Sequence, residues 1–93
     1  MSLQSTMSAL ADPTRRKILK LLKKGCLSAG EISDHFKISA PAVSRHLNVL
    51  KSAGLVRDMR GGKFIFYVLN TSVLEEILLF VKDIKGDNND KKI

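Results

Sequence analysis

The sequence predicts a mainly α-helical fold with about five helices and one two-stranded antiparallel hairpin. Apolar residues recur at intervals of three and four over most of the chain, which is the spacing of one helical face. A β-branched and aromatic stretch is divided by the pair Gly61-Gly62, the pattern of two strands joined by a tight turn. A length of 93 residues allows one domain, which we place at residues 1–85. Residues 86–93 are polar and aperiodic, and we expect them to be disordered.

Two helices are predicted in the first quarter of the chain. The first has an apolar stripe at i, i+4 and i+7, formed by Leu3, Met7 and Leu10. The second begins at Asp12, because aspartate is a good N-cap and the proline that follows is tolerated at the first helical position. It runs to about Lys24 and ends at Gly25. Its basic run from Arg15 onwards fits a solvated face better than a phosphate contact.

A short helix, a tight turn and a longer helix come next. Ser28 and Glu31 have the spacing of a capping box and predict a helix to about Phe36. Ser39 offers a second N-cap, and the longer helix runs from there to about Ala53. The longer helix has one apolar and one polar face, and no acidic residue occurs between positions 37 and 57.

The predicted hairpin occupies residues 55–69. Basic residues flank its tip, namely Arg60 and Lys63. The alternation along the second strand favours an inward face made of Ile65, Tyr67 and Leu69.

The last helix is more apolar than a surface helix needs to be. Asn70 or Thr71 caps it, it ends near Lys85, and eight of the twelve positions 73–84 are apolar. One apolar stripe suffices to pack on a core, so a second apolar face needs a partner, most simply a second copy of the chain. The predicted dimer interface combines Leu3, Met7, Leu10, Leu74, Ile77, Val81 and Ile84.

The charge and the order of the elements predict DNA binding. Residues 1–70 hold twelve Lys and Arg against four Asp and Glu, a net charge of +8, whereas residues 71–93 carry −1. A helix-turn-helix followed by a basic-tipped hairpin is a winged helix-turn-helix, whose second helix enters the major groove. Arginine binds guanine and asparagine binds adenine there, so Arg45, Asn48 and Lys51 are candidate contacts.

Three segments together resemble the ArsR/SmtB family of winged-helix repressors. They are ALADPTRRKILKLL (9–22), AGEISDHFKISAPAVSRHLNVLKSAGLV (29–56) and RGGKFIFYVLN (60–70), and the resemblance covers about residues 8–85. Within the family the chain is most similar to the small autorepressors of the SdpR type. The resemblance implies a homodimer that joins through its first and last helices and binds a palindromic operator. We expect the protein to be cytoplasmic and nucleoid-associated. The DNA contacts it implies are Ser39, Ala40, Pro41, Ser44, Arg45, Asn48 and Lys51 in the recognition helix, at about 39–53, with Arg60 and Lys63 in the wing.

The sequence departs from the metal-sensing members of that family. Those members carry a Cys-x-Cys where this chain has Ser28 and Gly30, neither of which is a soft-metal ligand. We therefore expect no metal and no other cofactor, and autoregulation of the operon without a metal. Cys26 is expected to be a small buried or half-buried residue, and a disulfide between two copies stays open. His46 fits a packed, hydrogen-bonded helix residue better than a DNA contact.

Other functions have weaker support. An enzyme is not expected, because no nucleophile with a base, phosphate-binding glycine loop or carboxylate pair occurs. No apolar run approaches a membrane span, and no small-molecule site is evident. We do not expect the protein to be secreted, because no charged and apolar leader pattern is present at the start of the sequence. The SdpR-type resemblance implies that a membrane protein sequesters the repressor. The alternative is a winged-helix protein-interaction module whose apolar last helix docks a different protein.

Overall fold

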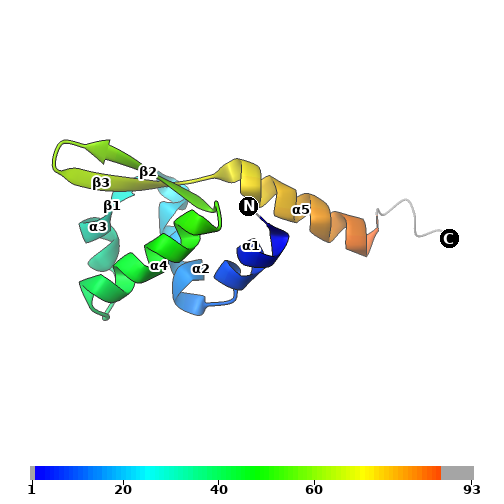
Figure 1. The fold of residues 1–93 in the computed structure, drawn as a ribbon, viewed down its shortest axis with the longest axis horizontal. Helices are drawn as coiled ribbons and strands as arrows, with labels where there is room; N and C mark the ends of the chain where they lie inside the picture. The colour runs from blue at the N-terminus through cyan, green and yellow to red at the C-terminus, as the bar shows by residue number, and fades with distance from the viewer. Residues whose placement is uncertain (1, 87–93) are drawn as a thin grey trace.

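The computed structural model describes residues 2–86 and contains, over that range, five α-helices and one three-stranded sheet (Figure 1). The disordered tail predicted at 86–93 lies, apart from its first residue, outside the described residues. The helices are α1 (Leu3–Leu10), α2 (Pro13–Leu21), α3 (Ala29–Ser33), α4 (Ala40–Ser52) and α5 (Thr71–Lys85), with a 3-10 turn η1 (Leu22–Lys24) after α2. The strands are β1 (Leu27–Ser28), β2 (Val56–Gly61) and β3 (Phe64–Leu69).

Side-chain caps start the helices where the sequence predicts them. A carboxylate oxygen of Asp12 accepts the backbone N–H of Arg15 at 3.0 Å and begins α2. The predicted capping box is confirmed, since the Ser28 hydroxyl accepts from Glu31 and the Glu31 carboxylate accepts from the backbone of Ser28. The Ser39 hydroxyl accepts the backbone N–H of Ala42 and caps α4, without a reciprocal bond because residue 42 is alanine. Each cap provides an acceptor for an N–H that has no partner within its helix.

The sheet has one strand more than the sequence predicts. Its order is β1-β3-β2 and all pairs are antiparallel. Strand β1 is only two residues long, and its second residue, Ser28, also caps α3. So short a strand has no alternation of apolar and polar residues from which the sequence could predict it. The predicted inward face of β3 is confirmed: Tyr67 is buried, and Ile65 and Leu69 pack against the core.

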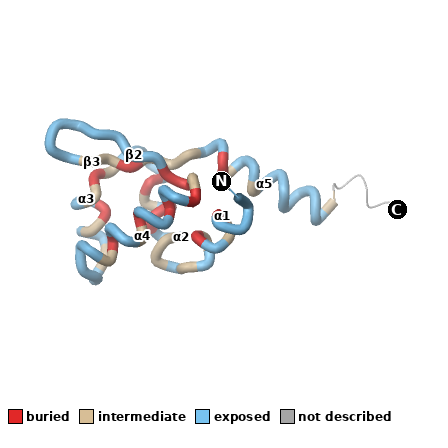
Figure 2. The backbone as a smooth tube through the Cα atoms, in the orientation of Figure 1, coloured by how far each residue is buried: buried red, intermediate tan, exposed pale blue. Residues whose placement is uncertain are grey.

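The core forms where the apolar faces of α2, α3 and α4 meet the inner face of the sheet. Figure 2 shows the buried positions gathered in the body around α4, while the hairpin tip and most of α5 are exposed. The largest fully buried side chains are Ile18, Leu22, Ile32, Val43, Leu47, Leu50, Leu55 and Val56. The apolar stripe of α4 thus faces inward, which leaves its polar face on the surface.

Helix α5 leaves the body after its first turns and projects away from it (Figure 1). Val73 is its only buried residue, while Leu74 and Ile77 pack partly against the core. The helix nevertheless exposes five large apolar side chains: Leu78 (55%), Leu79 (65%), Phe80 (38%), Val81 (46%) and Ile84 (69%). Of the α1 residues predicted to join them, Leu3 is exposed, whereas Met7 and Leu10 are half-buried.

Asn70 occupies the N-cap position of α5, but its side chain does not cap the helix. Its amide Nδ2 donates instead to the carbonyl of Gly54 at 2.9 Å, just beyond the end of α4. Its backbone N–H donates to the carbonyl of Leu55 at 2.9 Å. The start of α5 is therefore held to the end of α4.

This arrangement predicts that Asn70→Asp destabilises the fold. Aspartate caps helices as well as asparagine does, but it cannot donate to the Gly54 carbonyl, so we expect the free energy of unfolding to fall by about 1–3 kcal/mol. Urea unfolding at one fixed protein concentration measures this loss. Ser72→Ala, an exposed change in the same turn, is the control. Equal stability of Asn70→Asp and the wild type would show that the side chain only caps α5.

Candidate nucleic-acid interface

Helix α4 presents a continuous polar surface. Its buried residues Val43, Leu47 and Leu50 face the core, and the predicted DNA-contact residues lie on the remaining surface. All nine predicted contacts are exposed: Ser39, Ala40, Pro41, Ser44, Arg45, Asn48 and Lys51 on α4 or its cap, and Arg60 and Lys63 on the hairpin. The first turn of α4 adds backbone N–H groups and the positive end of the helix dipole, both of which favour an anion.

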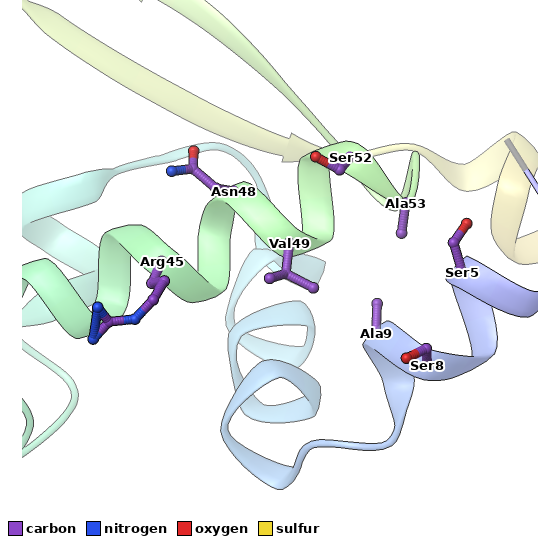
Figure 3. Close-up of a pocket in the computed structure, with 8 residues that line it drawn as sticks. All are labelled: Ser5, Ser8, Ala9, Arg45, Asn48, Val49, Ser52 and Ala53. Carbon is purple, nitrogen blue, oxygen red and sulfur yellow. The ribbon is translucent and has the colours of Figure 1, made fainter.

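A groove of about 360 Å³ runs between α4 and α1 (Figure 3). Arg45, Asn48 and Ser52 line it from α4, and the hydroxyls of Ser5 and Ser8 line it from α1. Its apolar floor is made of Ala9, Val49 and Ala53, and none of its eight lining residues is acidic. The sequence did not indicate these two serines, because helical periodicity does not reveal which helix lies beside α4.

The hairpin is joined to α4 by one ion pair. The Nζ atom of Lys51 lies 2.8 Å from the carboxylate of Asp58 on β2. The hydrogen bond from Lys51 holds the pKa of Asp58 below its ordinary value, and the same contact raises the pKa of Lys51. Arg60 lies two residues along β2 from Asp58, so it shares the face of the hairpin that is turned toward α4. Lys51 therefore has a partner within the protein and helps to position the wing.

The tip of the hairpin depends on its two glycines. Gly62 has φ +65°, a conformation that L side chains rarely adopt. At Gly61 a Cβ atom would come within 2.8 Å of the Phe66 ring, which covers the strand at this point. The glycines thus allow the tight turn that brings Arg60 and Lys63 to the end of the wing.

The basic run of α2 divides into two groups. Arg15 and Arg16 turn toward α1, and each donates to carbonyls near the end of that helix. The four lysines of the run are exposed: Lys17, Lys20, Lys23 and Lys24. The predicted solvated face thus applies to the four lysines and to Arg16, which is exposed, but not to the half-buried Arg15.

The expectation that Cys26 is buried or half-buried is wrong, because its side chain is exposed. It follows Gly25, which has φ +142°, in the link between η1 and β1, and the chain becomes buried only after it. Across residues 2–86, no group of three or more His, Cys, Asp or Glu side chains could hold a metal ion. Within the same range, no helix is long and apolar enough to cross a membrane.

Residues 12–58, from the cap of α2 to the middle of β2, match the family model described as bacterial regulatory protein, arsR family. The chain belongs to the ArsR family. The matched segment contains the helix-turn-helix α3–α4 and the Lys51–Asp58 pair.

Individual members of the ArsR family match over most of their length. The chain is 48% identical to the transcriptional repressor SdpR of Bacillus subtilis (strain 168), over 94% of this chain and 99% of that protein. It is 33% identical to the arsenical resistance operon repressor of Staphylococcus aureus, over 92% and 83% of the two chains. An ArsR-like transcriptional regulator from Rhodococcus sp. RHA1 shares the fold with a TM-score of 0.81 at 31% identity, covering 89% and 78%.

These matches confirm the winged helix-turn-helix fold and the resemblance to the ArsR family. The chain is a DNA-binding transcriptional repressor of the ArsR family and not an enzyme.

The Lys51–Asp58 pair predicts a pH-dependent contribution to stability. Because the pKa of Asp58 is lowered in the folded state, the contribution is present above the ordinary carboxyl pKa and is lost as the pH falls through the lowered value. Asp58→Asn should therefore lower the thermal unfolding midpoint at pH 7, and its difference from the wild type should shrink as the pH falls below the ordinary carboxyl pKa. The effect should be small, since both groups are accessible to water.

Asp34→Asn is the matched control for this experiment, because Asp34 is exposed and forms no ion pair within residues 2–86. A difference between Asp58→Asn and the wild type that does not shrink as the pH falls through the acidic range would refute the assignment.

Proposed function

We propose that the protein is a homodimeric repressor that reads a palindromic operator with α4 and the wing and regulates its own operon without a metal. The observation that supports this most directly is the exposed, acid-free face of α4 beside a basic hairpin tip. Arginine and asparagine on such a face can form paired hydrogen bonds with guanine and adenine. A repressor of this kind would be found in the cytoplasm, bound to the nucleoid.

Each part of the interface has its own role in this proposal. Ser44, Arg45 and Asn48 read base edges in the major groove, while Ser39, Ala40 and Pro41 bring the start of α4 close to a phosphate. Arg60 and Lys63 contact the DNA backbone beside the site, which adds affinity without specificity. Lys51 contributes to DNA binding in two ways. Its half-exposed side chain lies on the DNA-facing surface of α4, and its ammonium group holds the wing in position through Asp58.

The homodimer is supported by the apolar surface of α5. Five neighbouring large side chains exposed on one projecting helix would be unfavourable in water, and a second copy would bury them. The interface would combine them with Leu3, Met7, Leu10, Leu74 and Ile77. A two-fold axis between copies would set the two α4 helices about 10 base pairs apart, or a multiple of that, on a palindrome.

Metal independence is supported by the start of α3. Its hydroxyl group at Ser28 is already engaged with the backbone of Glu31, and the position two residues on is glycine. Neither provides a thiolate for a soft metal. For the release of DNA, capture by a membrane protein stays a prediction from the SdpR-type resemblance.

Arg45→Ala should weaken binding to an operator selected from random DNA by about 10–100-fold, because one bidentate base contact is lost. Fluorescence anisotropy at a fixed salt concentration measures the effect. Arg57→Ala is the matched control, since Arg57 is an exposed arginine on the opposite face of the hairpin from Arg60. The contact assignment fails if the two variants bind equally well.

The double change Val81→Asp and Ile84→Asp should convert the protein to a monomer without unfolding it. Both side chains are exposed and lie beyond the part of α5 that packs on the body. Within one copy the two aspartates add only the weak repulsion of an exposed i, i+3 pair, whereas across the dimer four carboxylates would be brought together. Sedimentation velocity measures the mass, and Lys82→Asp, in the same turn, serves as the control. Persistence of the dimer would place the interface elsewhere.

A further inference from the structure

A polar cluster joins the end of α1, the start of α2 and the middle of α4. Its centre is the Arg15 guanidinium, whose Nε donates to the Ala9 carbonyl at 2.8 Å and whose Nη2 donates to the Ser8 carbonyl at 3.3 Å. The third nitrogen, Nη1, lies 3.3 Å from Nδ1 of His46. The Asp12 carboxylate, which accepts the backbone N–H of Arg15, lies 3.9 Å from the same His46 nitrogen.

The Arg15–His46 contact specifies the protonation state of the imidazole. A guanidinium has N–H donors and no acceptor, so Nδ1 of His46 must carry a free lone pair. The ring is then neutral, with its proton on Nε2. A second proton would convert Nδ1 into a donor, which ends the hydrogen bond and places two cations in contact.

The Asp12 carboxylate lies where it can pair with the His46 imidazole once the imidazole is protonated. The backbone N–H of Arg15 holds the pKa of Asp12 below its ordinary value, so the carboxylate stays ionised where a histidine gains its proton. Asp12 and Arg15 are the charged groups of α2 and its cap that face the ring. From α1 only carbonyl groups join the cluster, and within residues 2–86 no side chain of α3 or the sheet bonds to the ring. Protonation therefore exchanges one partner of His46 for another.

The cluster matters because of the elements it connects. His46 lies on α4 between the exposed Arg45 and the buried Leu47, with its side chain 23% exposed, so solvent protons reach it. Through Arg15 it is tied to the last carbonyls of α1, a helix of the proposed dimer interface. The neutral cluster thus fixes the orientation of α4 relative to that interface.

We infer that Arg15 and His46 are positioning residues that hold the recognition helix in register with α1, and that protonation of His46 weakens specific operator binding. The inference rests on the proposed function. Operator affinity should fall about tenfold between pH 8 and pH 5.5, which corresponds to one hydrogen bond of ordinary strength. Affinity for random DNA should not fall, because the added charge favours phosphate contacts.

The test measures dissociation constants for selected operator and for random DNA between pH 5.5 and pH 8 at constant ionic strength. His46→Gln keeps an acceptor for Arg15 but does not titrate, so it should bind like the wild type at pH 8 and keep that affinity at pH 5.5. Arg15→Lys lacks the planar fork, so it should bind about tenfold more weakly at pH 8 and show no further loss at low pH.

His35→Gln is the matched control, because His35 is the other histidine of the chain, is exposed in the turn after α3, and its ring nitrogen lies 3.0 Å from the backbone carbonyl of Glu31. It should keep the pH dependence of the wild type. Circular dichroism of each variant reports folding, and should Arg15→Lys unfold, His46→Gln still decides the question.

The inference would be overturned if the operator affinity of the wild type did not change with pH, or if His46→Gln had the same pH dependence as the wild type. In either case, specific operator binding at pH 8 would still uphold the proposed function. Absence of any operator preference at pH 8 would overturn both.

Discussion

The rest of the structure depends on the hydrogen bonds made at the end of α4, where α1 and α5 meet it. The last carbonyls of a helix have no partner within it, and here neighbouring helices supply the donors. The hydroxyl of the buried Thr6 on α1 lies 3.0 Å from the Ser2 carbonyl and 3.3 Å from the Ala53 carbonyl, so its single O–H is shared between them. The Asn70 amide at the start of α5 donates to the Gly54 carbonyl. Gly54, with φ +80°, turns the chain so that the Ala53 carbonyl faces Thr6 and the Gly54 carbonyl faces the Asn70 amide. One turn of backbone therefore joins the recognition helix to α1 and to α5.

This hydrogen bonding connects α5, a long helix with little contact to the body, to the end of the helix that carries the proposed DNA contacts. Only the first turns of α5 pack on the core, so its direction is determined at Asn70 and Val73. A partner bound to the exposed part of α5 would therefore be connected, through the start of α5, to the end of α4. The Arg15–His46 contact ties the middle of α4 to α1 in the same way. In a dimer built on α1 and α5, the spacing of the two recognition helices would follow from these few hydrogen bonds.

The sequence was sufficient for features that depend on neighbours along the chain. The caps at Asp12, Ser28 and Ser39, the apolar stripe of α4 and the glycine turn of the wing all follow from local spacing. It was insufficient where a contact joins distant positions. Strand β1 exists only because Leu27 and Ser28 meet β3, and neither the Arg15–His46 contact nor the place of Ser5 and Ser8 beside α4 has a periodic signal. Cys26 was placed wrongly because small apolar residues are usually buried, whereas a glycine turn exposes this one.

The positions of the acidic residues determine which basic residues of the body have a carboxylate partner. Four carboxylates occur in residues 1–70, and three of them are engaged within the protein. Asp12 and Glu31 cap helices, and Asp58 pairs with Lys51. Asp34 is exposed without an ion pair in the described range, but it belongs to the turn after α3 and not to α4 or the wing. No carboxylate within residues 2–86 is therefore paired with Arg45, Arg60 or Lys63. These three basic groups thus remain available on α4 and the hairpin tip, where phosphate groups can balance their charge.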